Sequence, residues 1–456
     1  MRRRHMYRQA GLWALLALAG GCASTAQHPR LPTPRPLAAH YESSLDREAD
    51  AARTPPVEGL LTLDQALALA LMHNPSLAAF AYDVRAAEAL RLQAGRLINP
   101  QVELEIEEYD RDGAGIESSE TVVGLTQWIE LGGKRHWRTR VAEARGELKG
   151  WDYERQRLDV FSQTAQRVVG VIAAQRRLTL AESTVELAEQ TNHAVTERVK
   201  AGKEPPLQAS KAAAELEMVR LNALEATSGL ELARLALAAM WGADEASFEA
   251  VAGDTDRTLD AVPALATLKS RLAMNPELAR WDSEISLRQA ALRSARTARV
   301  PDLKAALRYA QYEEDGTDAF SFGVTVKLPI FDRNQGGVAA AALALEQAEV
   351  EREATALQLG GALTEAHAAL ALAQQRVDAL RTKVVPAMQS AFDGAAEGYR
   401  QGKFGFLEML DAQRRLIETN ERLLDAWRDH RSAQITINRI AGPAVEVDPL
   451  LEQEKH

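Results

Sequence analysis

Two carboxylates lie three residues apart near the end of the chain, within the stretch YRQGKFGFLEMLDAQ that begins at Tyr399. If this stretch is helical, Glu408 and Asp411 share one face, because side chains three positions apart are neighbours on a helix. Carboxylates gathered at one point attract cations. On spacing alone, however, the favoured interpretation is a solvated helix start, where the helix dipole stabilises acidic side chains.

No other residue type that carries chemistry forms a recognisable constellation. There is no HExxH or similar metal-ligand spacing, no phosphate-binding glycine loop and no Ser/His/Asp signature of a hydrolase. A single cysteine excludes an internal disulfide framework and a thiolate zinc cluster. We therefore predict that the protein is not an enzyme and holds no cofactor or resident metal ion. Five histidines are interpreted as ordinary residues on helix faces: His73, His136, His193, His367 and His430.

The composition excludes one further class of protein. The chain has 456 residues, enough for two or three ordinary domains or for one elongated domain. Its net charge of −10 offers no basic surface to a polyanion. We therefore expect no nucleic-acid partner.

The N-terminus indicates export from the cytoplasm. Residues 1–21 combine an arginine-rich start with the short apolar run GLWALLALA, which is typical of a signal peptide. Cys22 follows in LAGGC, which resembles a bacterial lipobox and implies a lipidated thiol, and Ala23 after it implies sorting to the outer membrane. The alternative is a chance cysteine beside an ordinary cleavage site. Residues 22–60 are rich in proline and predict an extended, lipid-anchored tether.

One unit of about two hundred residues occurs twice along the chain. HNPSLAAF, from His73, recurs as MNPELARW, from Met274, and INPQVELEIEEYD recurs as VPDLKAALRYAQYEED. We therefore predict two repeats, at residues 61–250 and 251–442, followed by a C-terminal tail at 443–456.

Each repeat contains two short segments in which apolar and polar residues alternate, as in strands with one apolar face. Such strands could pack on a soluble core, or they could cross a membrane, because about ten residues is the length that a tilted barrel strand needs. The signal peptide favours the membrane. Four strands cannot close a barrel and open edges are not tolerated in lipid, so several copies would share one barrel. The predicted strands are residues 101–110, 119–129, 302–312 and 319–329.

The remaining sequence predicts unusually long helices. No proline occurs between Pro100 and Pro205, so one helix can run from about residue 134 to residue 200, a length of roughly 100 Å. A second long helix is predicted from about residue 337 to 401, with a bend at Pro386, where the backbone loses a hydrogen bond. Apolar or small residues recur at every seventh position of the first helix and predict a coiled-coil seam at Trp137, Ala144, Trp151, Leu158, Ala165 and Ile172.

Shorter helices are predicted to run back, at about residues 207–241 and 404–440, which makes two antiparallel hairpins. Each hairpin breaks at a Gly-Lys pair, and Gly202 and Gly402 suit a turn because glycine adopts positive φ without strain. The predicted hairpin tips are residues 200–206 and 401–406.

Together, the lipobox, the duplicated unit, the paired strands and the long helices with glycine tips resemble the TolC-like outer-membrane efflux proteins, from Leu61 to Gly442. The LGGKR at Leu131–Arg135 is most similar to their heavy-metal (cobalt-zinc-cadmium resistance) branch. The resemblance implies a mainly α fold with a membrane β-barrel portion, in which three chains form a twelve-stranded barrel continued by a periplasmic helical tunnel. It also implies a periplasmic adaptor, an inner-membrane RND-type proton-driven pump and outer-membrane lipid as partners.

The same resemblance assigns roles to the hairpin tips. In a homotrimer, Glu408 and Asp411 would form rings of gate carboxylates that select cations at the narrowest point, whereas the first tip has Gln208 and Lys211 at the matching positions. The adaptor is expected to contact the tips at Gly202, Lys203, Gly402, Lys403 and Leu407.

The predicted function is a passive exit duct in the bacterial outer membrane that exports heavy-metal cations from the periplasm or cytoplasm. Two alternatives within export are a duct for organic drugs and a duct for a secreted polypeptide. A third alternative is a periplasmic coiled-coil scaffold lipoprotein without a pore, although a scaffold has no use for hairpins of membrane-spanning length.

Overall fold

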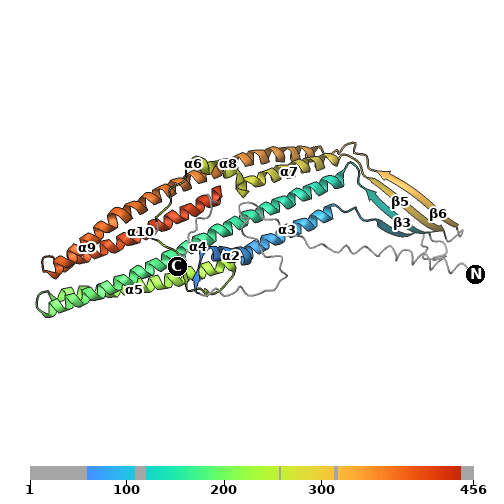
Figure 1. Cartoon of the computed structure of the whole chain (residues 1–456). Coiled ribbons are helices and arrows are strands. Elements are labelled where there is room, and N and C mark those ends of the chain that lie inside the picture. Colours follow the sequence, from blue (N-terminus) through green and yellow to red (C-terminus); the bar gives the residue numbers. More distant parts are fainter. Residues whose placement is uncertain (1–58, 108–119, 256–257, 313–316, 443–456) are drawn as a thin grey trace, which may run out of the picture. The chain divides into compact units, whose positions relative to one another are not determined.

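The computed structural model describes residues 59–107, 120–255, 258–312 and 317–442, which belong to one compact unit, Leu31–His456. The predicted signal peptide, Cys22, nearly all of the tether and the C-terminal tail lie outside the described residues. Within the described residues the chain is mostly helical and contains two separate sheets (Figure 1).

Each repeat opens with a helix capped in the same way. α3 (Pro75–Ala94) begins after Asn74, and α7 (Pro276–Thr297) begins after Asn275. The side-chain oxygen of each asparagine accepts a hydrogen bond from the backbone N–H two residues later, at 3.0 Å in the first repeat and 2.8 Å in the second. Asparagine is a preferred N-cap and proline suits the first helical position, so the Asn-Pro pair specifies the start of both helices.

The two asparagines also connect the start of each repeat to its end. The amide nitrogen Nδ2 of Asn74 donates to the carbonyl of Met240 at 2.7 Å, and that of Asn275 donates to the carbonyl of Ile440 at 2.7 Å. Both asparagines are buried, and a buried amide without a hydrogen-bond partner would destabilise the fold. Each bond therefore satisfies the asparagine amide and the carbonyl that it binds. The duplication in the sequence is therefore a duplication in structure.

The two hairpins are made of the longest helices. The first hairpin consists of α4 (Lys134–Lys200) and α5 (Pro206–Ala238), and the second of α8 (Gln335–Ala379), α9 (Val385–Arg400) and α10 (Phe406–Ala441). α4 is one uninterrupted helix of 67 residues over the predicted range. None of the described helices combines the length and the apolar composition needed to span a membrane.

The predicted seam along α4 is only partly buried. Ala144, Ala165 and Ile172 are buried, whereas the tryptophans and the leucine of the pattern are half-buried. The reason is that α4 packs against α3, α5, α7 and α10 rather than against a single partner helix, so no single stripe is enclosed. A strict heptad seam belongs to a two-stranded coiled coil.

The predicted bend in the second long helix takes the form of a π-helical segment, Leu380–Val384, which separates α8 from α9. Pro386 occupies the first turn of α9. A proline there lacks the N–H that would continue the helix and pushes against the carbonyl of the preceding turn, which a wider π turn accommodates.

Shorter elements surround the middle of the hairpins. Some of them enclose the largest cluster of buried apolar residues, which includes Leu67, Val171 and Phe248, whereas α6 and η4 pack against a separate cluster that includes Leu268 and Leu363. Two of the shorter elements, β1 and β4, pair in parallel and form the smaller sheet. These elements are β1 (Leu60–Leu61), α2 (Leu63–His73), the 3-10 helix η3 (Ala239–Trp241), β4 (Ala250–Val251), α6 (Leu265–Lys269) and the 3-10 helix η4 (Leu272–Met274).

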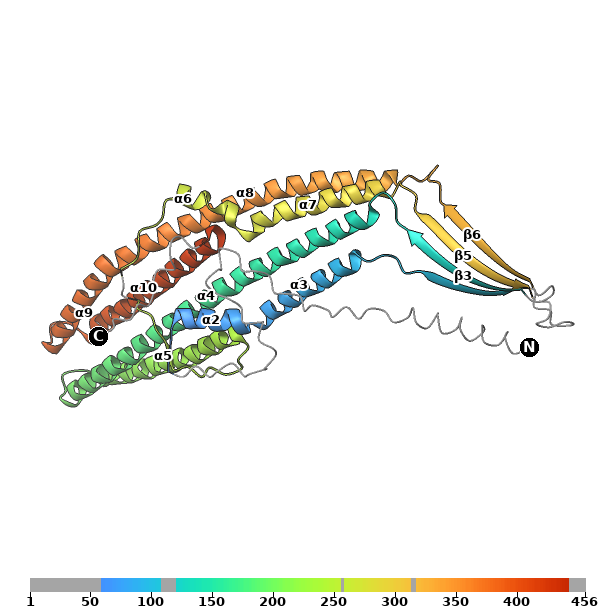
Figure 2. The same ribbon diagram turned by 45° about the vertical axis from the view of Figure 1, so that its right-hand side comes forward.

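The larger sheet joins strands from both repeats. It lies beyond the ends of α3, α4, α7 and α8, at the far end from the hairpin turns (Figures 1 and 2). Its strand order is β2-β3-β5-β6 and every neighbouring pair is antiparallel. Within the described residues, β2 and β6 have no partner on their outer edges. The strands are β2 (Gln101–Glu107), β3 (Glu120–Ile129), β5 (Leu303–Tyr312) and β6 (Thr317–Val326).

One face of this sheet is apolar and exposed. Val102, Leu125, Leu307 and Phe322 lie opposite one another across the four strands, and they are 63%, 49%, 51% and 73% exposed. A row of large apolar side chains left open to solvent indicates a surface that is covered in the working protein.

The opposite face is polar or small at the adjacent register. Glu103, Gly124, Arg308 and Ser321 lie opposite one another there, and Arg308 Nη2 lies 3.4 Å from the Glu103 carboxylate. The sheet therefore separates an apolar side from a polar side, as the alternation in the sequence predicts.

Candidate functional site

The two hairpins end in the same turn. Gly202 and Gly402 have φ values of 71° and 73°, in the left-handed region that the sequence predicts for them. In the first turn the N–H of Lys203 donates to the carbonyl of Arg198 at 2.9 Å, and in the second the N–H of Lys403 donates to the carbonyl of Gly398 at 2.8 Å. A bond spanning six residues with a left-handed glycine is the Schellman helix ending, which satisfies carbonyls that the helix leaves free.

The two turns lie side by side, and Arg198 connects them (Figures 1 and 2). Its Nη1 donates to the main-chain carbonyl of Tyr399 at 3.2 Å, and its guanidinium carbon lies 4.7 Å from the centroid of the Tyr399 ring. Its Nη2 also lies 3.5 Å from a carboxylate oxygen of Glu204, in the first turn. One cation of the first repeat thus binds the main chain and the aromatic ring of the second repeat.

Apolar packing encloses this contact. Tyr399 is only 2% exposed, and burial raises the pKa of its phenol, an effect that nearby Glu204 strengthens and Arg198 opposes. The hydroxyl has no hydrogen-bond partner among the described residues. The buried cluster around it draws on both hairpins and comprises Val195, Ala212, Phe392, Tyr399, Phe406, Met409, Leu410 and Leu416.

A second link joins the hairpins, about two to two and a half turns into α5 and α10 from the hairpin ends. Arg414 of α10 forms two hydrogen bonds with the carboxylate of Glu215 in α5, one of them from Nε at 3.1 Å. The hydrogen bond that Arg414 donates to Glu215 raises the pKa of Arg414 above its ordinary value. A bidentate arginine–carboxylate pair fixes relative orientation as well as distance.

The predicted gate carboxylates lie in the first two turns of α10, and both are exposed. Glu408 folds back towards the start of its helix, with Oε2 2.7 Å from the point that a Cβ on Gly405 would occupy. Asp411 accepts a hydrogen bond from Nε of Arg415 at 2.9 Å. Within one chain, Asp411 is therefore paired on its own helix and Glu408 lies against the N-cap residue Gly405, as in a solvated helix start.

The remaining predicted tip residues are also accessible. Lys203, Lys403 and Leu407 are exposed at the two turns, beside Gly202 and Gly402. Within the described residues, neither lysine side chain makes a hydrogen bond or an ion pair.

Metal-ligand groups are absent from the described part of the chain: nowhere there do three or more His, Cys, Asp or Glu side chains gather to hold an ion. The five histidines lie in α2, α4, α8 and α10. His430 differs from the rest because it is 3% exposed. Burial, with a smaller contribution from the adjacent Arg431, lowers the pKa of His430 to about 4.

Sequence reasoning missed Arg198 and Tyr399. They stand four residues before Gly202 and three residues before Gly402, inside the two stretches that mark the tips. The two positions are not equivalent in the repeats, so the only available signal was that a cation in one stretch and an aromatic ring in the other each lie within four residues of the turn glycine. Nothing in either stretch alone indicates that the two turns touch.

A sequence profile of the family described as "Outer membrane efflux protein" matches residues 66–243 and 267–443, one match in each repeat. The cobalt-zinc-cadmium resistance protein CzcC of Cupriavidus metallidurans is 33% identical over 384 residues, which cover 84% of this chain and 90% of that protein. The nickel-cobalt-cadmium resistance protein NccC of Alcaligenes xylosoxydans xylosoxydans is 27% identical and covers 68% and 69%.

Two solved channel structures have a similar fold. CusC superposes with a TM-score of 0.73 at 19% identity, covering 92% of this chain and 99% of that one. The CmeC outer-membrane channel of Campylobacter jejuni superposes with a TM-score of 0.69 at 18% identity, covering 83% and 85%. These neighbours are channels rather than enzymes. The chain belongs to the outer membrane efflux protein family, which confirms the resemblance seen in its sequence.

Proposed function

We propose that three copies of this outer-membrane efflux protein form a passive exit duct for heavy-metal cations. The proposal rests mainly on the four-stranded sheet, which has an exposed apolar face and, in the described part of the chain, two unpaired edges. Lipid tolerates apolar strands only when every edge is paired. Three copies of four strands give a twelve-stranded barrel, a size within the range of known membrane barrels.

Strand length agrees with this arrangement. β3, β5 and β6 each contain ten residues, and a tilted strand of about that length crosses the hydrocarbon core. The apolar row faces lipid, and the face that carries Glu103 and Arg308 faces a water-filled lumen. α4 and its neighbours then continue the lumen into the periplasm.

Metal cations are the favoured cargo. Three relatives are named for resistance to cobalt, zinc, cadmium or nickel. The chain itself needs no resident metal site for this task, because an ion in transit must leave as easily as it enters. A duct for organic compounds or for a polypeptide is the alternative, and it shares the same architecture.

The hairpin ends form the gate. Arg198 with Tyr399 and Arg414 with Glu215 hold the two hairpins of one chain together, and in this proposal the contacts belong to the closed arrangement. A periplasmic adaptor that binds the open arrangement more tightly would shift the population towards it. Its contacts are the exposed tip residues Gly202, Lys203, Gly402, Lys403 and Leu407.

Threefold symmetry would convert the exposed carboxylates into rings. Glu408 and Asp411 of three chains would place six carboxylates around the axis, where they would attract cations and reject anions. The local pairing of Asp411 with Arg415 weakens this charge without cancelling it, because exposed ion pairs are loosely held.

The N-terminal segment and the partners complete the proposal. Removal of a signal peptide at 1–21 and lipidation of Cys22 would anchor the tether to the inner side of the outer membrane. An inner-membrane proton-driven pump would supply the energy. Mass spectrometry of the mature N-terminus tests the anchor, since an unmodified Cys22 would exclude it.

Growth of a deletion strain tests the cargo. The gene, restored on a plasmid, should recover tolerance to zinc, cobalt, cadmium or nickel but not to a panel of dyes and antibiotics. Recovery against organic compounds alone would keep the duct and replace the cargo. Conductance in a planar bilayer separates the duct from a pore-free scaffold, because a scaffold gives none.

A further inference from the structure

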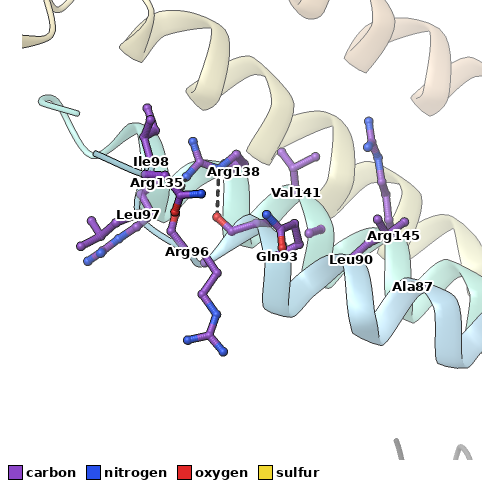
Figure 3. A pocket seen from close by; sticks show the side chains of 14 residues that line it. Ala87, Leu90, Gln93, Arg96, Leu97, Ile98, Arg135, Arg138, Val141 and Arg145 are labelled. Carbon is purple, nitrogen blue, oxygen red and sulfur yellow. Dashed lines mark hydrogen bonds between the residues drawn. The ribbon is translucent and has the colours of Figure 1, made fainter. Parts of the chain in front are cut away.

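A groove lies where α3 ends and α4 begins, close to the strands (Figure 3). Its volume is about 1050 Å³, and it is lined by the end of α3, the segment 95–99 and the first turns of α4. The lining contains no acidic residue but includes four arginines, which are Arg96, Arg135, Arg138 and Arg145.

Arg138 has a structural task. Its guanidinium forms two hydrogen bonds with the carboxylate of Glu130, and it also donates to the carbonyl of Ala94 at 2.9 Å and of Arg96 at 3.1 Å. Arg138 therefore fixes the end of α3 against the start of α4. Most of the N–H donors of its guanidinium are already engaged in these bonds.

Arg135 and Arg145 have no such task. Both are exposed, and neither has a hydrogen bond or ion pair from its side chain to any residue in the described part of the chain. Arg135 lies beside Arg138, and Arg145 lies about two turns after Arg138 along α4. The side chain of Arg96 points away from the other three (Figure 3). Along α4, the two unpaired guanidinium groups of Arg135 and Arg145 therefore lie on either side of Arg138, which is held by Glu130.

The second repeat shows that folding does not require this positive charge. There Asn334 donates from Nδ2 to the carbonyl of Ala295 at 2.9 Å, and Ala295 is the counterpart of Ala94. A neutral side chain therefore makes the same connection between the helices. Counted from the paired glycines that precede α4 and open α8, the counterparts of Arg135, Arg138 and Arg145 are Ala339, Ala342 and Glu349.

We propose that the groove binds a small multivalent oxyanion, of the class of phosphate or sulfate, through Arg135 and Arg145. A guanidinium offers a planar fork of donors that matches two oxygens of such an anion. The start of α4 adds to the positive potential, because its N-cap is Gly133, no side chain caps it and no acidic residue occurs in its first turn. Leu90 and Ile98 also border the groove.

The groove opens on the polar side of the sheet. Arg138 binds Glu130, which follows β3 and continues the alternation of Thr126 and Trp128, on the same side as Gly124. If the proposed duct is correct, the site lies on the wall of the lumen, where the helical tunnel meets the barrel. An occupied site would then neutralise positive charge that otherwise repels passing metal cations. This placement depends on the proposed function, whereas the binding of the anion does not.

Calorimetric titration of the purified full-length protein in a neutral detergent tests the site. Sodium phosphate is titrated at constant ionic strength, with sodium chloride as the reference. The test variant is Arg135→Gln with Arg145→Gln, which leaves Arg138 in place. The matched control is Arg293→Gln with Arg299→Gln, which removes the same charge from exposed arginines at the equivalent end of α7, outside the groove.

We expect the wild type and the control to bind phosphate equally and the test variant to bind at least about tenfold more weakly, because each lost charge-assisted pair contributes about this factor. Equal binding by test and control variants, or a response to chloride as large as to phosphate, would overturn the site. If the double variant does not fold, the single exposed change Arg145→Gln replaces it.

A lipid headgroup is the other source of a phosphate. Short-chain phosphatidylglycerol that binds at this groove while inorganic phosphate does not would contradict a free anion. Because the titration requires no membrane and no pore, loss of conductance with retained phosphate binding would count against the duct alone. Conductance without phosphate binding would count against this site alone.

Discussion

The guanidinium of Arg198 covers the ring of Tyr399 at 4.7 Å and donates to the carbonyl of the same residue at 3.2 Å. The two residues lie in different repeats, about two hundred positions apart, and each belongs to the last turn of a helix before a left-handed glycine. The contact therefore joins the ends of the two hairpins directly. In the proposed duct this contact would have to break if the two hairpin ends move apart when the gate opens.

Replacement of Arg198 should loosen the closed gate. Arg198→Ala removes a cation–π contact and a hydrogen bond to a carbonyl, together worth about 1–2 kcal/mol. We expect a higher leak conductance in planar bilayers and easier proteolysis at the turns, with Arg198→Lys in between. The control is Arg400→Ala, an exposed residue whose ion pair is with Glu397 on its own helix. Equal leak from both alanine variants would contradict the role of Arg198.

Two glycines of α9 should respond in opposite ways to alanine. A Cβ on Gly398 would lie 2.7 Å from Cε2 of Phe404, so Gly398→Ala must displace the ring that packs on the turn, at a cost of about 1–3 kcal/mol. Gly394 has nothing within 4 Å of its Cβ position, and Gly394→Ala should stabilise the helix by about 0.5–1 kcal/mol. Thermal unfolding of the two variants should therefore shift in opposite directions, and a lower Tm for Gly394→Ala would contradict this explanation.

The sequence predicts the elements well wherever one local rule decides them. α4 has the predicted bounds because no proline interrupts it, and Gly133 and Gly202 flank it. The turns follow from Gly202 and Gly402 for the same kind of reason. The seam of every seventh residue is less informative, because a periodic pattern cannot tell how many helices will surround it.

The contact between Arg198 and Tyr399 could not be predicted from the sequence, because it depends on how the two hairpins pack in space. Arg198 and Tyr399 meet only because the two repeats fold alike and pack in parallel, which places their turns together. The same symmetry explains why Asn74 and Asn275 make equivalent bonds and could be paired in advance through the repeated Asn-Pro. Arg198 and Tyr399 occupy different positions in their repeats, so no repeated motif in the sequence indicates that they pair.

His430 should make stability depend on pH. Its pKa is about 4 in the folded protein, below the ordinary value of 6.5 that applies when the chain is unfolded. The unfolded chain therefore binds more protons between these values, so the free energy of unfolding falls as pH drops from about 6.5 to about 4, by up to about 3 kcal/mol, and this loss levels off below.

Chemical denaturation at pH 7 and pH 4.5 measures this effect. His430→Gln should reduce the difference between the two pH values, whereas His193→Gln, at an exposed position of α4, should leave it unchanged. Other groups also titrate in this range, so the effect of His430 is measured as the difference in pH dependence between His430→Gln and His193→Gln. An identical pH dependence in both variants would exclude His430 as the cause.

The last prediction concerns the carboxylates at the start of α10. Glu408→Gln with Asp411→Asn keeps the shape of both side chains and removes six negative charges from a trimer. We expect block of conductance by a multivalent cation to weaken by about tenfold, since charges a few ångströms apart in water interact by about 1 kcal/mol. The matched control is Glu418→Gln with Glu421→Gln, an exposed pair with the same spacing on the same helix, about two turns to three turns from Asp411. If the gate carboxylates form rings, only the first variant loses the block, because the control pair lies away from the narrow end. Equal block in both variants would show that Glu408 and Asp411 are ordinary residues of a solvated helix start.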